Sequence, residues 1–144
     1  MSSTTQSASP VVTHAWKGAV AGIAGGIVFG VLMAMMGMLK MIASMMGSES
    51  AVVGAVIHLM ISAFIGLVFG VIAGSLAQRI GPLLGAGAAY GVVWWVLGPL
   101  VIMPTMMGMP MFNINQTAMM SLMGHVIYGL VTAVAFFFLS RRSA

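Results

Sequence analysis

Four long apolar stretches, separated by short polar breaks, dominate the chain. The first follows Lys17, the polar segment 47–50 precedes the second, and the polar segment 113–117 opens the fourth. The third stops at Pro104, and Pro99 is expected to kink its last turns. A helix of about 20 apolar residues crosses a bilayer. The pattern therefore predicts four transmembrane helices, at about 18–39, 52–76, 83–103 and 118–139.

The composition places this pattern in a membrane protein. Of the 144 residues, 61% are hydrophobic, and only five are basic and one is acidic. Such a chain cannot cover a soluble fold with a hydrated surface. We therefore predict an all-α integral membrane protein in which residues 17–144 form a single four-helix domain. Residues 1–16 are predicted to be a disordered cytoplasmic tail.

The few charges predict the orientation in the membrane. Four spans place most of the basic residues on the side that carries both termini, namely Lys17, Arg79, Arg141 and Arg142. The opposite side carries Lys40 and Glu49. By the positive-inside rule, both termini are cytoplasmic and the protein lies in the inner membrane. Because the cations are isolated and form no basic patch, a nucleic-acid partner is not expected.

Few residues in this chain could carry conventional catalysis. Glu49 is the only acidic residue, and there is neither aspartate nor cysteine. Paired-acid hydrolysis, carboxylate-held Mg²⁺ and thiolate metal sites therefore lack their side chains. The sequence predicts a protein that is not an enzyme.

Small residues recur every four positions in three of the stretches, which is the spacing that lets membrane helices approach closely. The predicted packing residues are Gly18, Gly22, Gly26, Gly30, Gly54, Ser62, Gly66, Gly70, Gly74 and Gly129. In the third stretch the same spacing selects Gly81, Gly85 and Ala89. We expect a compact four-helix bundle built from two helical hairpins.

A gap-free shift of 67 residues superimposes the first two stretches on the last two, and it predicts an internal repeat. His58 then coincides with His125, and Gly22 with Ala89. Because each repeat has two spans, the halves would share one topology about a pseudo-two-fold axis along the membrane normal. The two histidines would then lie at similar depth, in helices that run in the same direction.

A histidine inside a membrane needs a compensating interaction, and several remain open for this pair. A bond to a backbone carbonyl, or to Ser62, Ser121 or Tyr128, would satisfy a neutral imidazole. Alternatively, His58 and His125 could hold haem b between them, bind Cu(I), or take part in a proton- or substrate-linked path.

Sixteen of the seventeen methionines lie in the outer part of the predicted topology. They could simply fill irregular interfaces, form an adaptable docking surface, or offer thioether ligands to Cu(I). The pairs with a four-residue spacing would place two sulfur atoms on one helical face. The ligand or metal candidates are His58, His125, Met41, Met45, Met60, Met107, Met111, Met119, Met120 and Met123.

The segments "GAVIHLMISAFIGLVFG" (54–70), "MPTMMGMPM" (103–111) and "LMGHVIYGLV" (122–131) resemble those of small, uncharacterised prokaryotic membrane proteins with four spans. The resemblance implies the four-span topology and no activity.

The first functional hypothesis is a non-enzymatic accessory or interaction subunit, without a cofactor, that forms a homo-oligomer or joins a larger membrane assembly. The alternatives are a Cu(I)- or haem-binding protein that uses His58 and His125, and a small oligomeric transporter or channel.

Overall fold

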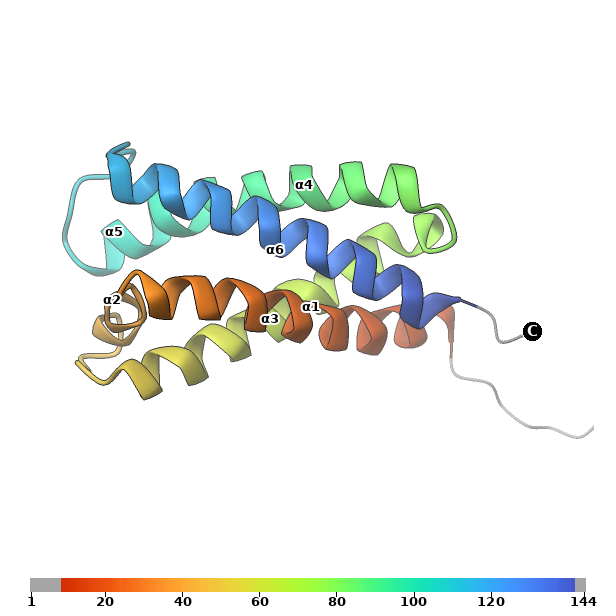
Figure 1. Ribbon diagram of the computed structural model, residues 1–144, viewed down its shortest axis with the longest axis horizontal. Coiled ribbons are helices and arrows are strands. Elements are labelled where there is room, and N and C mark those ends of the chain that lie inside the picture. Colours follow the sequence, from red (N-terminus) through yellow and green to blue (C-terminus); the bar gives the residue numbers. More distant parts are fainter. Residues whose placement is uncertain (1–8, 142–144) are drawn as a thin grey trace, which may run out of the picture.

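The computed structural model describes residues 9–141, and all regular secondary structure in that range is helical (Figure 1). The four long helices are α1 (Pro10–Met35), α3 (Ala51–Ala73), α4 (Ile80–Leu97) and α6 (Gln116–Ser140). The shorter elements are α2 (Leu39–Ser44), the 3₁₀ turn η1 (Gly74–Leu76), the π-helix η2 (Gly98–Ile102) and α5 (Met103–Met106). The predicted all-α fold with four long apolar helices is confirmed, and the chain is a multi-pass membrane protein whose helices contact the lipid bilayer.

The first span begins at Pro10 instead of near residue 18. Ser9 caps this helix, because its side chain accepts a hydrogen bond from the backbone N–H of Val12 at 3.3 Å. Pro10 suits the first helical position, where no N–H partner is lost. The predicted disordered tail is therefore wrong over residues 10–16, and residues 1–8 lie outside the described part of the chain.

At its other end, α1 stops at Met35 rather than at residue 39. Gly37 follows with φ +69°, a left-handed conformation that glycine adopts without strain and that reverses the chain. The short helix α2 then crosses the start of α3, where Gly54 contacts the backbone of Leu39. A turn and a separate helix thus replace the end of the predicted first span.

The third span continues past Pro104 to Met106, so its predicted end at residue 103 is too early. Pro99 and Pro104 lack backbone N–H groups, and the helix widens to a π-helix, η2, between them. The carbonyl of Leu100, which Pro104 cannot bond, accepts the N–H of Phe112 at 2.9 Å. This bond folds the following loop back onto η2.

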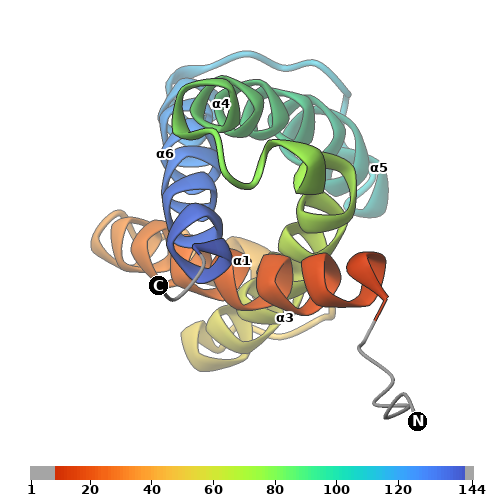
Figure 2. The same cartoon turned by 90° about the vertical axis from the view of Figure 1, so that its right-hand side faces the viewer.

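We call the end with the start of α1, the end of α6 and the turn 77–79 the terminal end, and the end with α2, α5 and the loop 107–115 the hairpin end (Figures 1 and 2). Lys17, Arg79 and Arg141 belong to the terminal end, while Lys40 and Glu49 belong to the hairpin end. Arg142 lies outside the described residues. The assignment of the terminal end to the cytoplasm stays a prediction.

The bundle consists of two hairpins, α1 with α3 and α4 with α6, which meet mainly along α1 and α6. Figure 2 shows the four helices around the bundle axis. By contrast, α3 and α4 hardly touch. The bundle is therefore closed along three of its four seams.

Close backbone contact holds α1 to α3. A methyl group added to Gly18, Gly22, Gly66 or Gly70 would overlap backbone atoms of the opposite helix. Three other glycines of this hairpin face side chains: Gly26 faces Ser62, Gly30 faces the His58 ring and Gly74 faces the His14 ring. Such close approach supplies van der Waals attraction between the helices. This attraction matters in a membrane, because the hydrophobic effect does not drive helices together in lipid.

In the second hairpin, a different stripe of α4 makes the close contact. Gly87 and Gly91 meet the backbone of Gly129 and His125, whereas Gly85 has no atom within 4 Å of an added methyl group. The predicted packing stripe of the third stretch is therefore wrong, because it lies on a different face of α4 from the one that contacts α6. The predicted repeat pairs Gly22 with Ala89. In the structure, however, Gly87 packs against α6 as Gly22 packs against α3. These contacts therefore do not show the gap-free repeat.

Aromatic side chains fill the terminal half of the bundle. The Phe69 ring lies 5.2 Å from the Tyr90 ring and 6.0 Å from the Phe136 ring, measured between centroids. Leu83 and Ala133 complete this buried cluster. The terminal half of the bundle thus contains a packed core.

Both tyrosines bond α3 from the second hairpin. The hydroxyl of Tyr128 donates to the carbonyl of Ser62, and that of Tyr90 donates to the carbonyl of Ile65, each at 2.7 Å.

We expect Tyr128→Phe to lower the free energy of unfolding by about 1 kcal/mol, a typical value for such a bond between membrane helices. Unfolding by SDS titration in mixed micelles measures this, and an unchanged stability would contradict the role of the bond.

Candidate functional site

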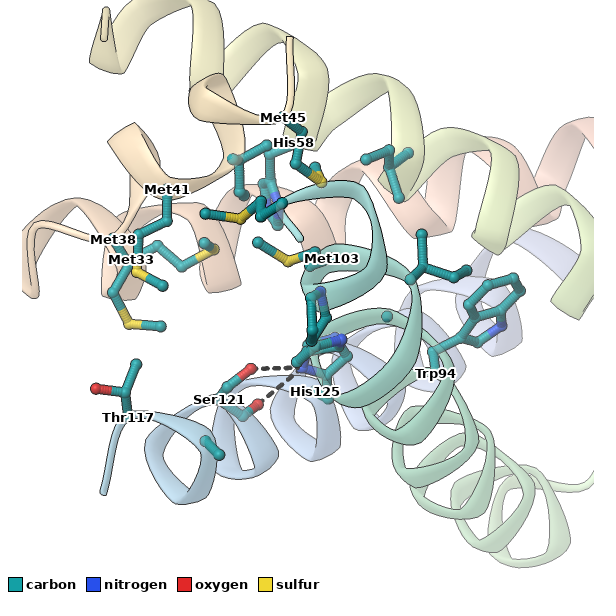
Figure 3. Close-up of a pocket in the computed structure, with 18 of the residues that line it drawn as sticks. Met33, Met38, Met41, Met45, His58, Trp94, Met103, Thr117, Ser121 and His125 are labelled. Carbon is teal, nitrogen blue, oxygen red and sulfur yellow. Dashed lines mark hydrogen bonds between the residues drawn. The ribbon is translucent and has the colours of Figure 1, made fainter. Parts of the chain in front are cut away.

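A cavity of about 470 Å³ lies between the two hairpins, toward the hairpin end (Figure 3). Residues from α1, α2, α3, α4, η2, α5 and α6 line it. Its walls include Phe29, Ile42, Ile65 and Trp94. The cavity is therefore mainly apolar, and segments that are far apart in the sequence build it.

His58 and His125, one from each hairpin, both line this cavity. The His58 ring donates from Nε2 to the carbonyl of Gly26 in α1, at 2.9 Å. The acceptor is a carbonyl, so the proton belongs to Nε2 and the lone pair is left on Nδ1. The sequence-based expectation that a backbone carbonyl could satisfy this ring agrees with the geometry.

The His125 ring uses its other nitrogen. Its Nδ1 donates to the carbonyl of Ser121 at 2.8 Å, and the Ser121 hydroxyl lies 3.3 Å from the same atom. The lone pair is then on Nε2. Among the described residues, neither His58 Nδ1 nor His125 Nε2 has a hydrogen-bond partner, and neither is a fully buried atom. Each imidazole thus keeps one nitrogen that can accept or coordinate.

Phe29 of α1 connects the two histidines. Its ring centroid lies 5.3 Å from that of His58 and 5.0 Å from that of His125, with edge-to-face geometry in both pairs. Phe29 is buried and also packs against Gly124 of α6. One aromatic side chain of α1 therefore contacts both imidazoles.

Methionines from both hairpins surround the rest of the cavity. In Figure 3 the labelled methionines and the two histidines enclose one space. The methionines that line it are Met33, Met38, Met41, Met45, Met103, Met107 and Met109. Met33 and Met38 are 6% and 9% exposed, whereas Met41 and Met109 are 41% and 52% exposed. The thioethers therefore extend from the protected interior to the surface.

Half of the sequence-predicted candidates do not line the cavity. Met60, Met111, Met119 and Met123 are exposed and Met120 is half-buried, all outside the lining. Conversely, Met33, Met38, Met103 and Met109 line the cavity but are not among the sequence candidates. Met33, Met38 and Met109 have no methionine four residues away, whereas Met103 is four residues from Met107. Their common signal is proximity to the bends at Gly37 and η2.

Polar groups occur at two levels of the cavity. Asn113, Asn115 and Thr117 line it at the hairpin end, where Asn115 also caps α6 by accepting from the N–H of Ala118 at 2.9 Å. Deeper in the bundle, Ser62 Oγ donates to the carbonyl of His58 at 2.7 Å. Among the described residues there is no group of three or more His, Asp, Glu or Cys side chains that could hold a metal ion. A metal site in this cavity would therefore need methionine ligands.

No protein-family model, curated protein or solved structure matches this chain. The resemblance to small prokaryotic membrane proteins with four spans therefore rests on the segments quoted above.

Proposed function

We propose that this non-enzymatic membrane protein binds one soft metal ion, Cu(I), in the cavity at its hairpin end, on the extracytoplasmic side. One observation supports the proposal above others. His58 and His125, which belong to different hairpins, line the same cavity together with seven methionines.

The donor set fits the chemistry of Cu(I). Thioether ligands select soft ions such as Cu(I), and neutral imidazole also binds copper, while Mg²⁺, Ca²⁺ and Mn²⁺ prefer oxygen ligands such as carboxylates. The N–H groups of both imidazoles donate to backbone carbonyls. That arrangement is common around metal-bound histidines, because it orients the ring and raises the basicity of the coordinating nitrogen.

The other functional hypotheses receive less support from this geometry. A haem between the two histidines would displace Phe29, whose ring contacts both imidazoles. A continuous transport path would cross the aromatic cluster of the terminal half, which includes Phe69 and Phe136. An accessory role, and assembly as a homo-oligomer or in a larger complex, stay predictions that are compatible with metal binding.

Titration with Cu(I) under anaerobic conditions, in competition with a chromophoric chelator, tests the proposal. We expect one ion per chain. The double variant His58→Ala, His125→Ala should bind at least about 100-fold more weakly, because it loses ligands rather than only their outer partners.

His14→Ala is the matched control. His14 is the third histidine, and it packs against Gly74 and Phe136 at the terminal end, outside the cavity. It should bind Cu(I) as the wild type does. Equal Cu(I) binding by the wild type and the double variant, with both helical by circular dichroism, would refute the proposed site.

A further inference from the structure

The cavity reaches the one seam of the bundle that is not closed. Ile61 of α3 and Ile102 of η2 line the cavity and are 40% and 45% exposed. These two residues belong to the hairpins on either side of the seam, where α3 and α4 hardly touch. Toward the terminal end, the bond from Tyr90 to the carbonyl of Ile65 closes the seam.

The position of this opening determines what can enter. Both α3 and the helical segment that contains η2 are spans in contact with the bilayer. The opening between Ile61 and Ile102 thus faces lipid, and molecules dissolved in the membrane meet it directly. The polar residues Asn113 and Asn115 line the cavity at the hairpin end instead.

The size and walls of the cavity suit an organic molecule better than water or an ion alone. A volume of about 470 Å³ lies within the range of sites for small molecules, which are mostly apolar with a few polar groups. One metal ion fills only a small part of that space. Apolar cavities do not hold water well, because water needs several polar partners.

Two ring nitrogens of the histidines that line this cavity lack hydrogen-bond donors. His58 Nδ1 and His125 Nε2 have no partner among the described residues, and both rings line the cavity. An unpaired acceptor in apolar surroundings is unfavourable, and a hydroxyl group supplies the missing donor.

We propose that the cavity admits, through the opening between Ile61 and Ile102, a small apolar molecule from the bilayer that carries a hydroxyl group, and that this group donates to a histidine nitrogen. This inference goes beyond the metal proposal and does not depend on it. Because the hydroxyl group and Cu(I) use the same nitrogen lone pairs, the two ligands compete.

Quenching of tryptophan fluorescence by brominated probes tests the inference in metal-free protein. Trp94 lines the cavity, so 11-bromo-1-undecanol should quench its emission with saturation, and Trp94→Phe should remove the saturable part. The probe 1-bromoundecane, which lacks the hydroxyl group, should need an about fivefold higher mole fraction for half-saturation. The double variant His58→Ala, His125→Ala should remove this difference between the probes.

A pair of variants on α3 tests the route of entry. Ile61→Phe should narrow the opening and slow the approach to saturated quenching after 11-bromo-1-undecanol is added. Val56→Phe is the control, because Val56 is exposed on α3 and lies outside the cavity lining. Three results would each overturn the inference. They are quenching that rises without saturation, equal quenching by the two probes, and equal rates of quenching in the two α3 variants. The Cu(I) titration could still succeed in that case, so the two proposals fail separately.

Discussion

Replacing Gly87 by leucine should prevent stable packing of α4 against α6. An added methyl group at this position would already overlap the carbonyl of Gly129, and a larger side chain would separate the helices along the seam. We expect a loss of about 3 kcal/mol or more in the free energy of unfolding, or no folded protein. SDS-titration unfolding and the yield of monodisperse protein measure the effect.

Gly85→Leu is the matched control on the same helix. An added methyl group at Gly85 has no atom within 4 Å, and leucine favours helix more than glycine does. This variant should be as stable as the wild type or slightly more stable. If Gly85→Leu were the damaging change and Gly87→Leu were tolerated, the observed face of α4 would be wrong and the sequence-predicted face would be right.

Phe29→Ala should destabilise the protein by about 3 to 5 kcal/mol, because a buried aromatic side chain is removed and its space is not refilled. The lost ring contacts His58, His125 and Gly124, so the cost falls on both hairpins at once. SDS-titration unfolding measures this loss as well.

Phe64→Ala is the control for this prediction. Phe64 lies on α3 and is 61% exposed, so its removal should cost far less than that of Phe29. Equal costs for the two variants would show that Phe29 does not hold the hairpins together.

The sequence predicted the four spans because the bilayer imposes a length and a composition that short polar breaks interrupt. It also predicted the small-residue faces of α1 and α3, where one ladder dominates. The charge at Lys17 suggests that the first span begins after it, whereas the capping residue Ser9 and Pro10 begin α1 earlier in the chain. Capping residues determine where the helix begins, whereas a charged residue indicates only where the chain meets the membrane surface.

The face of α4 could not be predicted from spacing alone. Its sequence contains two small-residue stripes, Gly81–Gly85–Ala89 and Gly87–Gly91, and the choice between them depends on contact with α6. The residues that line the cavity could not be predicted from spacing alone either. Its methionines come together because the chain turns at Gly37 and the helix widens at η2, and these bends direct α2 and α5 toward the histidines.

Copper K-edge X-ray absorption on the protein loaded with one equivalent of Cu(I) tests the central claim most directly. The claim is that a histidine pair and thioethers from both hairpins share one soft-metal site. It predicts a spectrum with both nitrogen and sulfur scatterers, and loss of the nitrogen shell in the double variant His58→Ala, His125→Ala. A spectrum without sulfur, or one that the double variant leaves unchanged, would contradict it.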